Sequence, residues 1–217
     1  MNLLYAACWC SFRVFFRTYF RWRVYHRERV PRAGPFILAS NHASFFDPPL
    51  IGTACPRAIS YLARESLFRY PVVGRALRTV YAIPVNRDGG GAAGLKGILD
   101  RLRAGGGIIL FPEGTRTRDG NLQPARSGIG LTVIKSTAPV VPTRVFGTFE
   151  AFSRHARFPK PHQVVVKFGR PVDSSELRAE AKDCSKARLK EIYQEVADRI
   201  MASIAKLEPC QDKDSFP

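Results

Sequence analysis

Acidic residues are scarce in this sequence of 217 residues. Asp and Glu number 18 against 34 Lys and Arg, which gives a net charge of +16. This balance excludes an anionic protein and favours a polyanionic partner, either nucleic acid or an anionic membrane. The apolar content of 45% is ordinary for a globular protein. The length fits one domain better than two.

Cysteine pairs and long apolar runs are also lacking. The cysteines are Cys8, Cys10, Cys55, Cys184 and Cys210. Their number is odd and no Cys-x-x-Cys occurs, which disfavours a disulfide framework or a zinc site and predicts reduced thiols in the cytosol. No uncharged apolar stretch reaches about 18 residues, so we expect no transmembrane helix. The apolar run 3–10 precedes its basic residues, the reverse of a secretory signal.

The first thirty residues combine arginine with aromatic residues and contain no Gly or Pro. On a helix, Arg13, Arg17, Arg21, Arg23 and Arg27 fall within an arc of roughly 160°. A basic face opposite an aromatic face is typical of a helix lying in a lipid interface, where each charge contributes about 1 kcal/mol. We therefore predict a membrane-associating amphipathic helical segment over residues 1–32. The alternative is that the aromatic face packs on the protein itself.

The remaining sequence alternates between strand and helix patterns. The expected strands are 35–39, 58–63, 82–85, 107–111, 138–146 and 163–168. The expected helices are 47–54, 71–80, 91–103 and a helical region over 176–205. Pro84 would place its strand at a sheet edge. This alternation predicts an α/β fold with a mixed, mainly parallel sheet flanked by helices. We assign it to one domain, residues 33–207, followed by a frayed tail, 208–217.

A histidine follows the first of these strands, where α/β sheets present functional groups. A strand-to-helix turn can bring His42 to Asp47, so that the carboxylate fixes the imidazole tautomer and leaves a base. For an isolated His-x4-Asp, the simpler interpretation makes His42 a turn residue and Asp47 only a helix N-cap.

A second polar loop follows the strand 107–111. In Phe111 to Thr117, proline stops the strand and glycine permits a tight turn, which leaves Glu113 and Arg116 at one pocket edge. An arginine in such a loop suits bidentate binding of phosphate. Arg87, after the strand 82–85, and Arg126 are further candidate anion ligands.

These segments resemble the glycerolipid acyltransferase family, which includes 1-acyl-sn-glycerol-3-phosphate acyltransferases. Asn41-His42 to Asp47 resembles the Asn-His-x4-Asp block, and Phe111 to Thr117 is similar to Phe-Pro-Glu-Gly-Thr-Arg-Ser, with Thr117 in place of Ser. Residues 81–87 and 140–143 are similar to two weaker blocks, in the family's order. The sequence departs from the family at Arg126, where such enzymes often have Lys.

The resemblance implies an enzyme that acylates a lysophospholipid, most often 1-acyl-glycerol-3-phosphate, giving phosphatidic acid. His42 would be the general base and Asp47 would orient it. The residues implied for the acceptor phosphate are Arg87, Glu113, Gly114, Thr115, Arg116 and Arg126, and those implied for the acyl site are Val141 and Pro142. The resemblance implies no bound cofactor and no metal, and an acyl-CoA or acyl carrier protein donor. It also implies peripheral or monotopic association with the cytoplasmic face of the inner membrane.

Two alternatives stay open at this point. The acceptor could instead be a lyso-ornithine lipid, lysophosphatidylethanolamine or glycerol 3-phosphate. A non-catalytic basic protein that binds membrane or nucleic acid would explain the charge. It would not explain His42, Asp47 and Glu113 at strand ends, so we expect no nucleic-acid partner.

Overall fold

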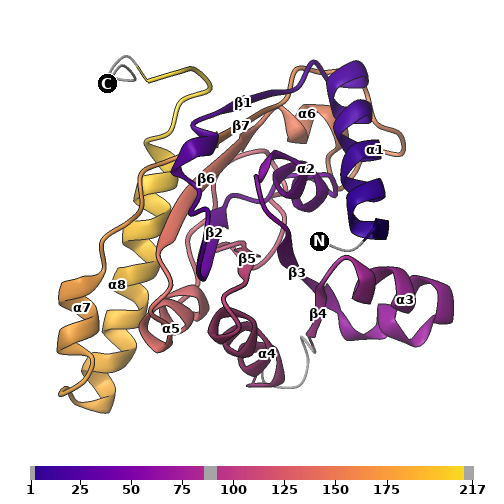
Figure 1. The fold of residues 1–217 in the computed structure, drawn as a ribbon. Helices are drawn as coiled ribbons and strands as arrows, with labels where there is room; N and C mark the ends of the chain where they lie inside the picture. Colours follow the sequence, from indigo (N-terminus) through magenta and orange to yellow (C-terminus); the bar gives the residue numbers. More distant parts are fainter. Residues whose placement is uncertain (1–2, 86–91, 213–217) are drawn as a thin grey trace.

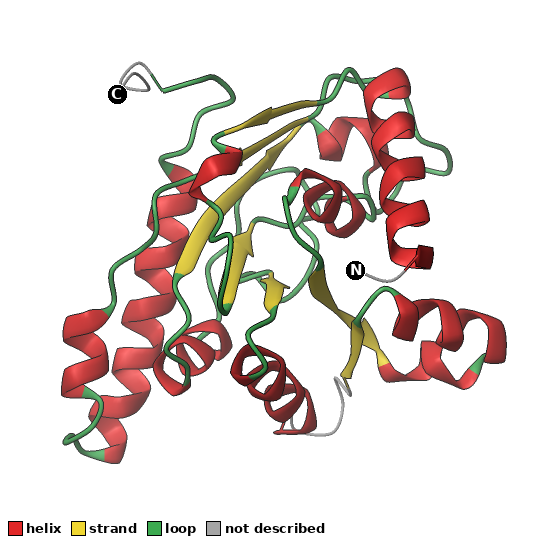
Figure 2. Cartoon of the chain, in the orientation of Figure 1, coloured by secondary structure: helices red, strands yellow, loops and turns green. Residues whose placement is uncertain are grey.

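A computed structural model of the chain describes residues 3–85 and 92–212. It contains one seven-stranded sheet with helices on both faces (Figures 1 and 2). The strands are β1 (Arg23–Tyr25), β2 (Phe36–Ser40), β3 (Ile59–Arg64), β4 (Ala82–Val85), β5 (Gly107–Leu110), β6 (Val140–Phe146) and β7 (Val165–Phe168). The α-helices are α1 (Leu3–Tyr19), α2 (Asp47–Ala54), α3 (Pro71–Thr79), α4 (Ala92–Arg103), α5 (Gly128–Lys135), α6 (Thr148–Phe152), α7 (Ser175–Glu180) and α8 (Lys186–Ala205). Two short 3-10 helices are η1 (Arg27–Arg29) and η2 (Glu65–Arg69).

The strand order is β1-β7-β6-β2-β5-β3-β4, and β6–β7 is the antiparallel pair among these neighbours. The predicted mixed, mainly parallel α/β sheet is therefore confirmed. Strand β4, which contains Pro84, lies at one edge of the sheet as predicted, where a residue without an N–H donor breaks no ladder.

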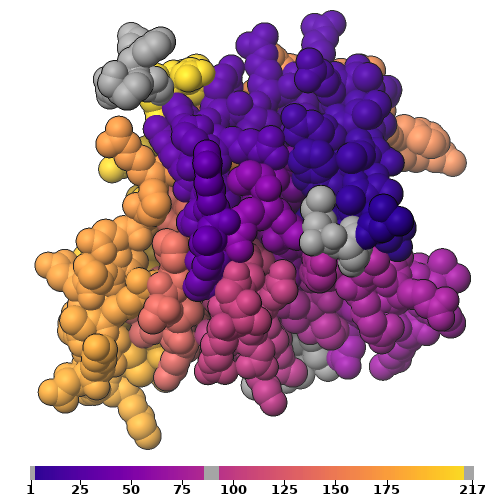
Figure 3. All heavy atoms as spheres, viewed as in Figure 1, coloured from indigo at the N-terminus to yellow at the C-terminus, as the bar shows by residue number. Residues whose placement is uncertain are grey.

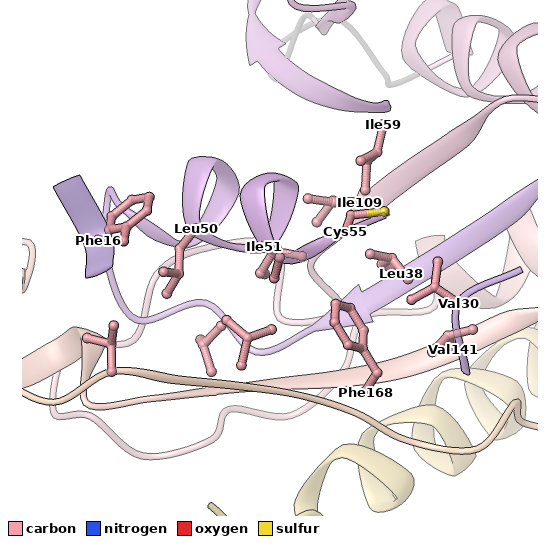
Figure 4. Close-up of a cluster of buried hydrophobic side chains, with 14 of the residues drawn as sticks. Phe16, Val30, Leu38, Leu50, Ile51, Cys55, Ile59, Ile109, Val141 and Phe168 are labelled. Atoms are coloured by element: carbon pink, nitrogen blue, oxygen red, sulfur yellow. The ribbon is translucent and has the colours of Figure 1, made fainter. Parts of the chain in front are cut away.

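Alternate residues of the central strands build two cores, one on each face of the sheet. Leu38 and Ile109 pack with α1 and α2 in one core, part of which is shown in Figure 4. Ile37 and Ile108, the preceding residue in each strand, pack with α4, α5 and α8 in the other. Burial on both faces explains why these strands read as continuous apolar runs rather than as alternating ones.

The amino-terminal segment is not one helix, which corrects the prediction for residues 1–32. Helix α1 ends at Tyr19, the backbone turns at Arg21 with a φ of +46°, and β1 pairs in parallel with β7. The physical reason is that β7 would otherwise present an unpaired edge, which β1 covers.

The aromatic residues of this segment largely face the domain. Phe16 and Phe20 are each 1% exposed and belong to the core beneath α1, and Trp22 packs against that core. The alternative interpretation, in which the aromatic face packs on the protein itself, therefore describes most of the segment. The outer side of α1 still exposes Leu3, Leu4 and Val14.

Other boundaries also differ from the predictions. The helical region 176–205 is two helices, α7 and α8, and the helices α5 and α6 were not predicted. The tail is not frayed over residues 208–212, because the buried Lys167 Nζ donates to the Cys210 carbonyl at 2.8 Å and pairs with Asp212 at 2.5 Å. Residues 213–217 lie outside the described residues. Within the described residues, no helix has the length and apolarity needed to cross a bilayer.

Candidate active site

Two loops at the carboxyl ends of neighbouring parallel strands form the site. Ala39 of β2 pairs with Leu110 of β5, and His42 and Glu113 each lie three residues further along the chain. The equal offset brings the loops side by side. The His42 N–H donates to Glu113 Oε1 at 3.3 Å, and the Thr117 N–H donates to the His42 carbonyl at 2.8 Å. The structure thus joins the two loops that the sequence placed only at strand ends.

The structure brings His42 and Asp47 together. His42 Nδ1 donates to Asp47 Oδ2 at 2.8 Å, and the same oxygen accepts the N–H groups of Ala43 at 2.6 Å and Ser44 at 2.7 Å. Asp47 is fully buried and is the first residue of α2, whose N-cap is Phe46. The interpretation of Asp47 as an N-cap is therefore wrong, because its carboxylate turns back to the loop. A carboxylate at Nδ1 leaves Nε2 of the neutral imidazole to accept a proton.

Two further residues, whose roles the sequence did not reveal, fix His42. Asn41 is buried, and its side chain exchanges two hydrogen bonds with the Val145 backbone of β6, at 2.8 and 3.1 Å. Phe111 stacks on the His42 ring with centroids 3.9 Å apart and planes 14° apart. The imidazole is thus fixed by stacking and by its bond to Asp47, while its backbone is tied to β5 and β6. Both residues are the first residues of the predicted motifs, and that position is the signal that could have identified them.

Glu113 lies behind His42. It is 3% exposed, and burial raises the pKa of its carboxyl group to about 7, with the nearby charge of Asp47 adding to the effect. Its Oε1 accepts the His42 N–H, whereas Oε2 is buried and has no hydrogen-bond partner within the described residues. Glu113 is therefore poised to change its protonation state near neutral pH.

The arginine of the second loop faces the same site. The Arg116 guanidinium lies 3.4 Å from the ring centroid of Phe45, a cation–π contact that presents its planar face. Gly114 has a φ of +69°, and a Cβ there would approach Arg126 Cδ to 2.9 Å, so this position requires glycine. Thr115 is exposed on the same turn.

The structure does not place the other two predicted arginines, Arg126 and Arg87, at the cavity. Arg126 is exposed, its N–H donates to the Pro112 carbonyl at 2.9 Å, and its side chain passes beside Gly114 rather than lining the cavity described next. Arg87 lies outside the described residues, so its predicted role stays a prediction.

A cavity of about 690 Å³ opens beside His42 and Arg116. Its volume is within the range of roughly 300–1,000 Å³ that is usual for small-molecule sites. Four elements supply most of its wall: α1, α2, β3 and the segment from η2 to β4. The lining residues are Tyr5, Cys8, Trp9, Phe12, His42, Phe45, Pro48, Pro49, Gly52, Thr53, Tyr61, Leu62, Ala63, Arg64, Leu67, Leu77, Val80, Ala82 and Arg116. A mostly apolar wall with a histidine and an arginine suits a ligand that has a hydrocarbon chain and an anionic head.

The predicted acyl-site residues do not reach this cavity. Val141 is fully buried in the core with Leu38, and the ring of Pro142 lies against Gly169. They lie away from it because β2 and β5 separate β6 from the cavity wall that β3 provides, so their role at the acyl site stays a prediction. The cavity takes most of its apolar wall from segments outside the predicted motifs.

Curated proteins similar to this chain are acyltransferases. The 1-acyl-sn-glycerol-3-phosphate acyltransferase of Bacillus subtilis is 30% identical over 126 residues, 58% of this chain and 62% of that protein. The enzyme of that name from Borreliella burgdorferi is 32% identical, over 60% of this chain and 53% of that protein. A chloroplastic one from Brassica napus, BAT2, is 27% identical, over 66% and 42%. The chain thus spans between 42 and 62% of the length of these relatives.

A solved structure shares the fold. The crystal structure of the 1-acyl-sn-glycerophosphate acyltransferase PlsC from Thermotoga maritima has a TM-score of 0.70 and 24% identity, covering 94% of this chain and 80% of that one. The sequence matches the Acyltransferase family over residues 21–145, more than half of the chain and including both site loops. The chain therefore belongs to the Acyltransferase family.

Proposed function

We propose that this protein transfers a fatty acyl chain from a thioester to the free hydroxyl of a lysophospholipid, with 1-acyl-glycerol-3-phosphate as acceptor and phosphatidic acid as product. The observation that carries the proposal is the His42–Asp47 pair at the wall of an apolar cavity that Arg116 also lines. The names of the similar curated proteins support the same acceptor.

The proposed reaction needs a base because a free hydroxyl is a poor nucleophile near neutral pH. Nε2 of His42 takes the hydroxyl proton as the acceptor oxygen attacks the thioester carbonyl carbon. The C–S bond then breaks, and the departing sulfur receives the proton from the imidazolium. Asp47 stabilises the imidazolium through Nδ1, at 2.8 Å. Such general-base assistance typically contributes about 10²- to 10⁴-fold.

The acceptor's phosphate would lie against Arg116, whose planar guanidinium can bind two phosphate oxygens. Gly114 and Thr115 form the turn before it, and the Arg126 side chain beside Gly114 adds positive charge. Glu113 is buried behind His42, so we assign it to holding the two loops together rather than to contact with the acceptor. Arg87 remains a proposed phosphate ligand on sequence grounds alone.

The hydrocarbon chain would occupy the apolar cavity, which α1, α2 and β3 enclose next to His42. The acyl donor is proposed to be acyl-CoA or acyl carrier protein, since both present an acyl thioester. An acceptor of this kind is held in a bilayer, and the charge of +16 favours an anionic membrane surface as the place of reaction. We propose peripheral association, on the cytoplasmic face of the inner membrane.

An acyl-transfer assay with the purified protein tests the proposal. Lysophosphatidic acid, lysophosphatidylethanolamine, lyso-ornithine lipid and glycerol 3-phosphate would each be offered with acyl-CoA and with acyl carrier protein donors. We expect the highest kcat/KM with lysophosphatidic acid. A higher value with another lysolipid would change the acceptor, and failure to acylate any of them would refute the proposed activity.

A further inference from the structure

Large apolar side chains are exposed along η2 and the first turn of α3. The residues of this group, which we call the η2–α3 crest, are Leu67, Tyr70, Val72 and Val73, with exposed fractions of 41%, 63%, 82% and 43%. Soluble proteins rarely expose contiguous apolar side chains without an interaction to cover them. Of the other large exposed apolar residues in the described chain, Phe12, Phe45 and Leu62 line the cavity beside His42.

The crest projects from the domain rather than packing on it. Helix α3 packs chiefly on η2 and on β4, the edge strand of the sheet. A Cβ at Gly74 would come within 2.6 Å of the Phe68 carbonyl, so α3 lies tightly against η2. The two elements protrude together at the lower right of the molecule, and α8 lies on the left (Figures 1 and 3). The crest is therefore a rigid projection whose apolar side faces solvent.

The charges around the crest have one dominant sign. Arg64, Arg69, Arg75 and Arg78 are exposed between residues 62 and 80, and Glu65 is the acidic residue of that stretch. Apolar side chains surrounded by arginines are suited to an anionic bilayer, where the chains enter the interface and the arginines meet the headgroups. An acidic, apolar protein surface offers similar charge complementarity, but it would not explain the continuity with the cavity.

That continuity is carried by residues that belong to both surfaces. Leu67 is exposed on the crest and also lines the cavity, and Leu62 of β3, which is 38% exposed, lines the cavity as well. On the opposite wall, Phe12 of α1 is also 38% exposed and lines the cavity. An apolar path thus runs from the outer surface of the crest into the cavity next to His42.

We propose that the η2–α3 crest inserts into the headgroup region of an anionic membrane, so that a hydrocarbon chain passes from the bilayer into the cavity between α1 and η2–α3. This inference rests on the proposed function for what enters the cavity. It assigns the main membrane contact to a segment other than the amino-terminal aromatic residues, most of which are packed in the core.

Vesicle binding by the full chain tests the crest. The test variant is Val72→Asp with Val73→Asp, and the matched control is Ala187→Asp with Ala202→Asp, two exposed positions on α8 that receive the same charge. We expect the crest variant to bind phosphatidylglycerol vesicles at least about 10-fold more weakly than wild type in cosedimentation, and the control to differ far less. Equal binding by the crest variant and wild type would overturn the inference.

A gain-of-binding variant protects the test against misfolding. Val72→Trp adds an interfacial aromatic side chain at the most exposed crest position, so we expect tighter binding to both anionic and neutral vesicles. Unchanged binding by Val72→Trp would count against insertion. The inference would also be overturned if the wild-type protein did not bind vesicles but bound acidic acyl carrier protein through Val72 and Val73. That result would indicate a protein partner for the crest.

Activity assays separate this inference from the proposed function. Val72→Asp with Val73→Asp should acylate a monomeric short-chain lysolipid at the wild-type rate, yet lose at least about 10-fold in rate on acceptor held in vesicles. If the wild type acylates no acceptor, the proposed function fails, and the vesicle-binding assay still tests whether the crest inserts into a membrane. If the wild type is active and the crest variant equals it on vesicles, only the crest inference fails.

Discussion

Two clusters of charged and polar side chains in the described part of the chain have opposite characters. At the tail cluster, defined as His26, Arg29, Lys167 and Asp212, two cationic side chains converge on one carboxylate, Lys167 Nζ at 2.5 Å and Arg29 at 2.7 Å. His26 Nε2 accepts the backbone N–H of Asp212 at 3.2 Å. At the site, Asp47 and Glu113 lie close together, and within the described residues neither forms an ion pair with lysine or arginine.

The pKa values of the carboxyl groups in the two clusters are shifted in opposite directions. Bonding to Lys167, and then to Arg29, lowers the pKa of Asp212 to about 2, whereas burial raises the pKa of Glu113 to about 7. Glu113 Oε2 and Asp47 Oδ1 also lack hydrogen-bond partners among the described residues. A buried polar atom without a partner costs about 1–3 kcal/mol. The tail cluster is therefore built for stability, whereas the site retains an energetic cost, as functional sites often do.

The largest expected effect is a loss of activity when the histidine of the site, rather than the histidine of the tail cluster, is replaced. His42→Ala should lower kcat by about 10²- to 10⁴-fold, because the general base is lost while the fold is kept. Steady-state acyl transfer and circular dichroism would measure this. The matched control is His26→Asn in the tail cluster, chosen because His26 has a φ of +59°, which asparagine tolerates. Near-wild-type turnover by a folded His42→Ala protein would refute the mechanism.

A smaller effect is expected at the edge of the site. Arg116→Ala should raise the KM for the acceptor by about 10-fold and leave the KM for the donor nearly unchanged, because one charge-assisted bidentate contact is lost. Arg116→Lys should restore binding only partly, since lysine lacks the planar fork. Arg118→Ala, an exposed arginine of the same loop, is the control. A rise confined to the donor KM would contradict the assignment of Arg116.

The sequence predicted the features of the site that depend on local sequence pattern. His42 and Glu113 follow apolar strands, so their place at the carboxyl ends of these strands could be inferred, as could the place of β4 at a lateral edge of the sheet. The cavity could not, since its wall combines α1, β3 and η2–α3, which tertiary packing alone brings together. Val141 and Pro142 do not line the cavity because β2 and β5 separate β6 from β3, and a motif does not reveal this strand order.

The contacts of the tail cluster could not be predicted from the sequence either. Lys167 stands in a strand pattern and Asp212 in a polar tail, and the two are 45 residues apart. The amino-terminal segment shows a related limit, since its basic and aromatic arcs suited both a membrane and a protein core. Phe15, Tyr19 and Trp22 of the aromatic arc pack against the core.

Glu113 predicts a stability that falls as pH rises. Its pKa is about 7 in the folded chain against an ordinary 4.5, so the folded state holds the proton more tightly. The stabilisation is complete below pH 4.5 and is lost as pH rises to about 7, by up to about 3 kcal/mol. Glu113→Gln, which mimics the protonated form, should remove this dependence in urea unfolding at pH 5 and pH 8. Glu176→Gln, at an exposed carboxylate, is the control, and an unchanged pH dependence in Glu113→Gln would contradict the assignment.

Asp212 predicts the opposite pH dependence and the smallest effect. Its pKa of about 2 lies below the ordinary 3.8, so its stabilisation is present above pH 3.8 and is lost as pH falls through about 2. Because the side chain is 35% exposed, solvent screening reduces this contribution to about 1 kcal/mol. Asp212→Asn should therefore lower the free energy of unfolding by about that amount at pH 7. The difference in unfolding free energy between the variant and wild type should decrease as pH falls to 2, and the rate of acyl transfer should be unchanged. Urea unfolding at pH 7, 4 and 2 and the acyl-transfer assay would measure both. A marked loss of activity in the Asp212→Asn protein, at wild-type stability, would mean that the tail cluster serves the site, and the contrast between the two clusters would fail.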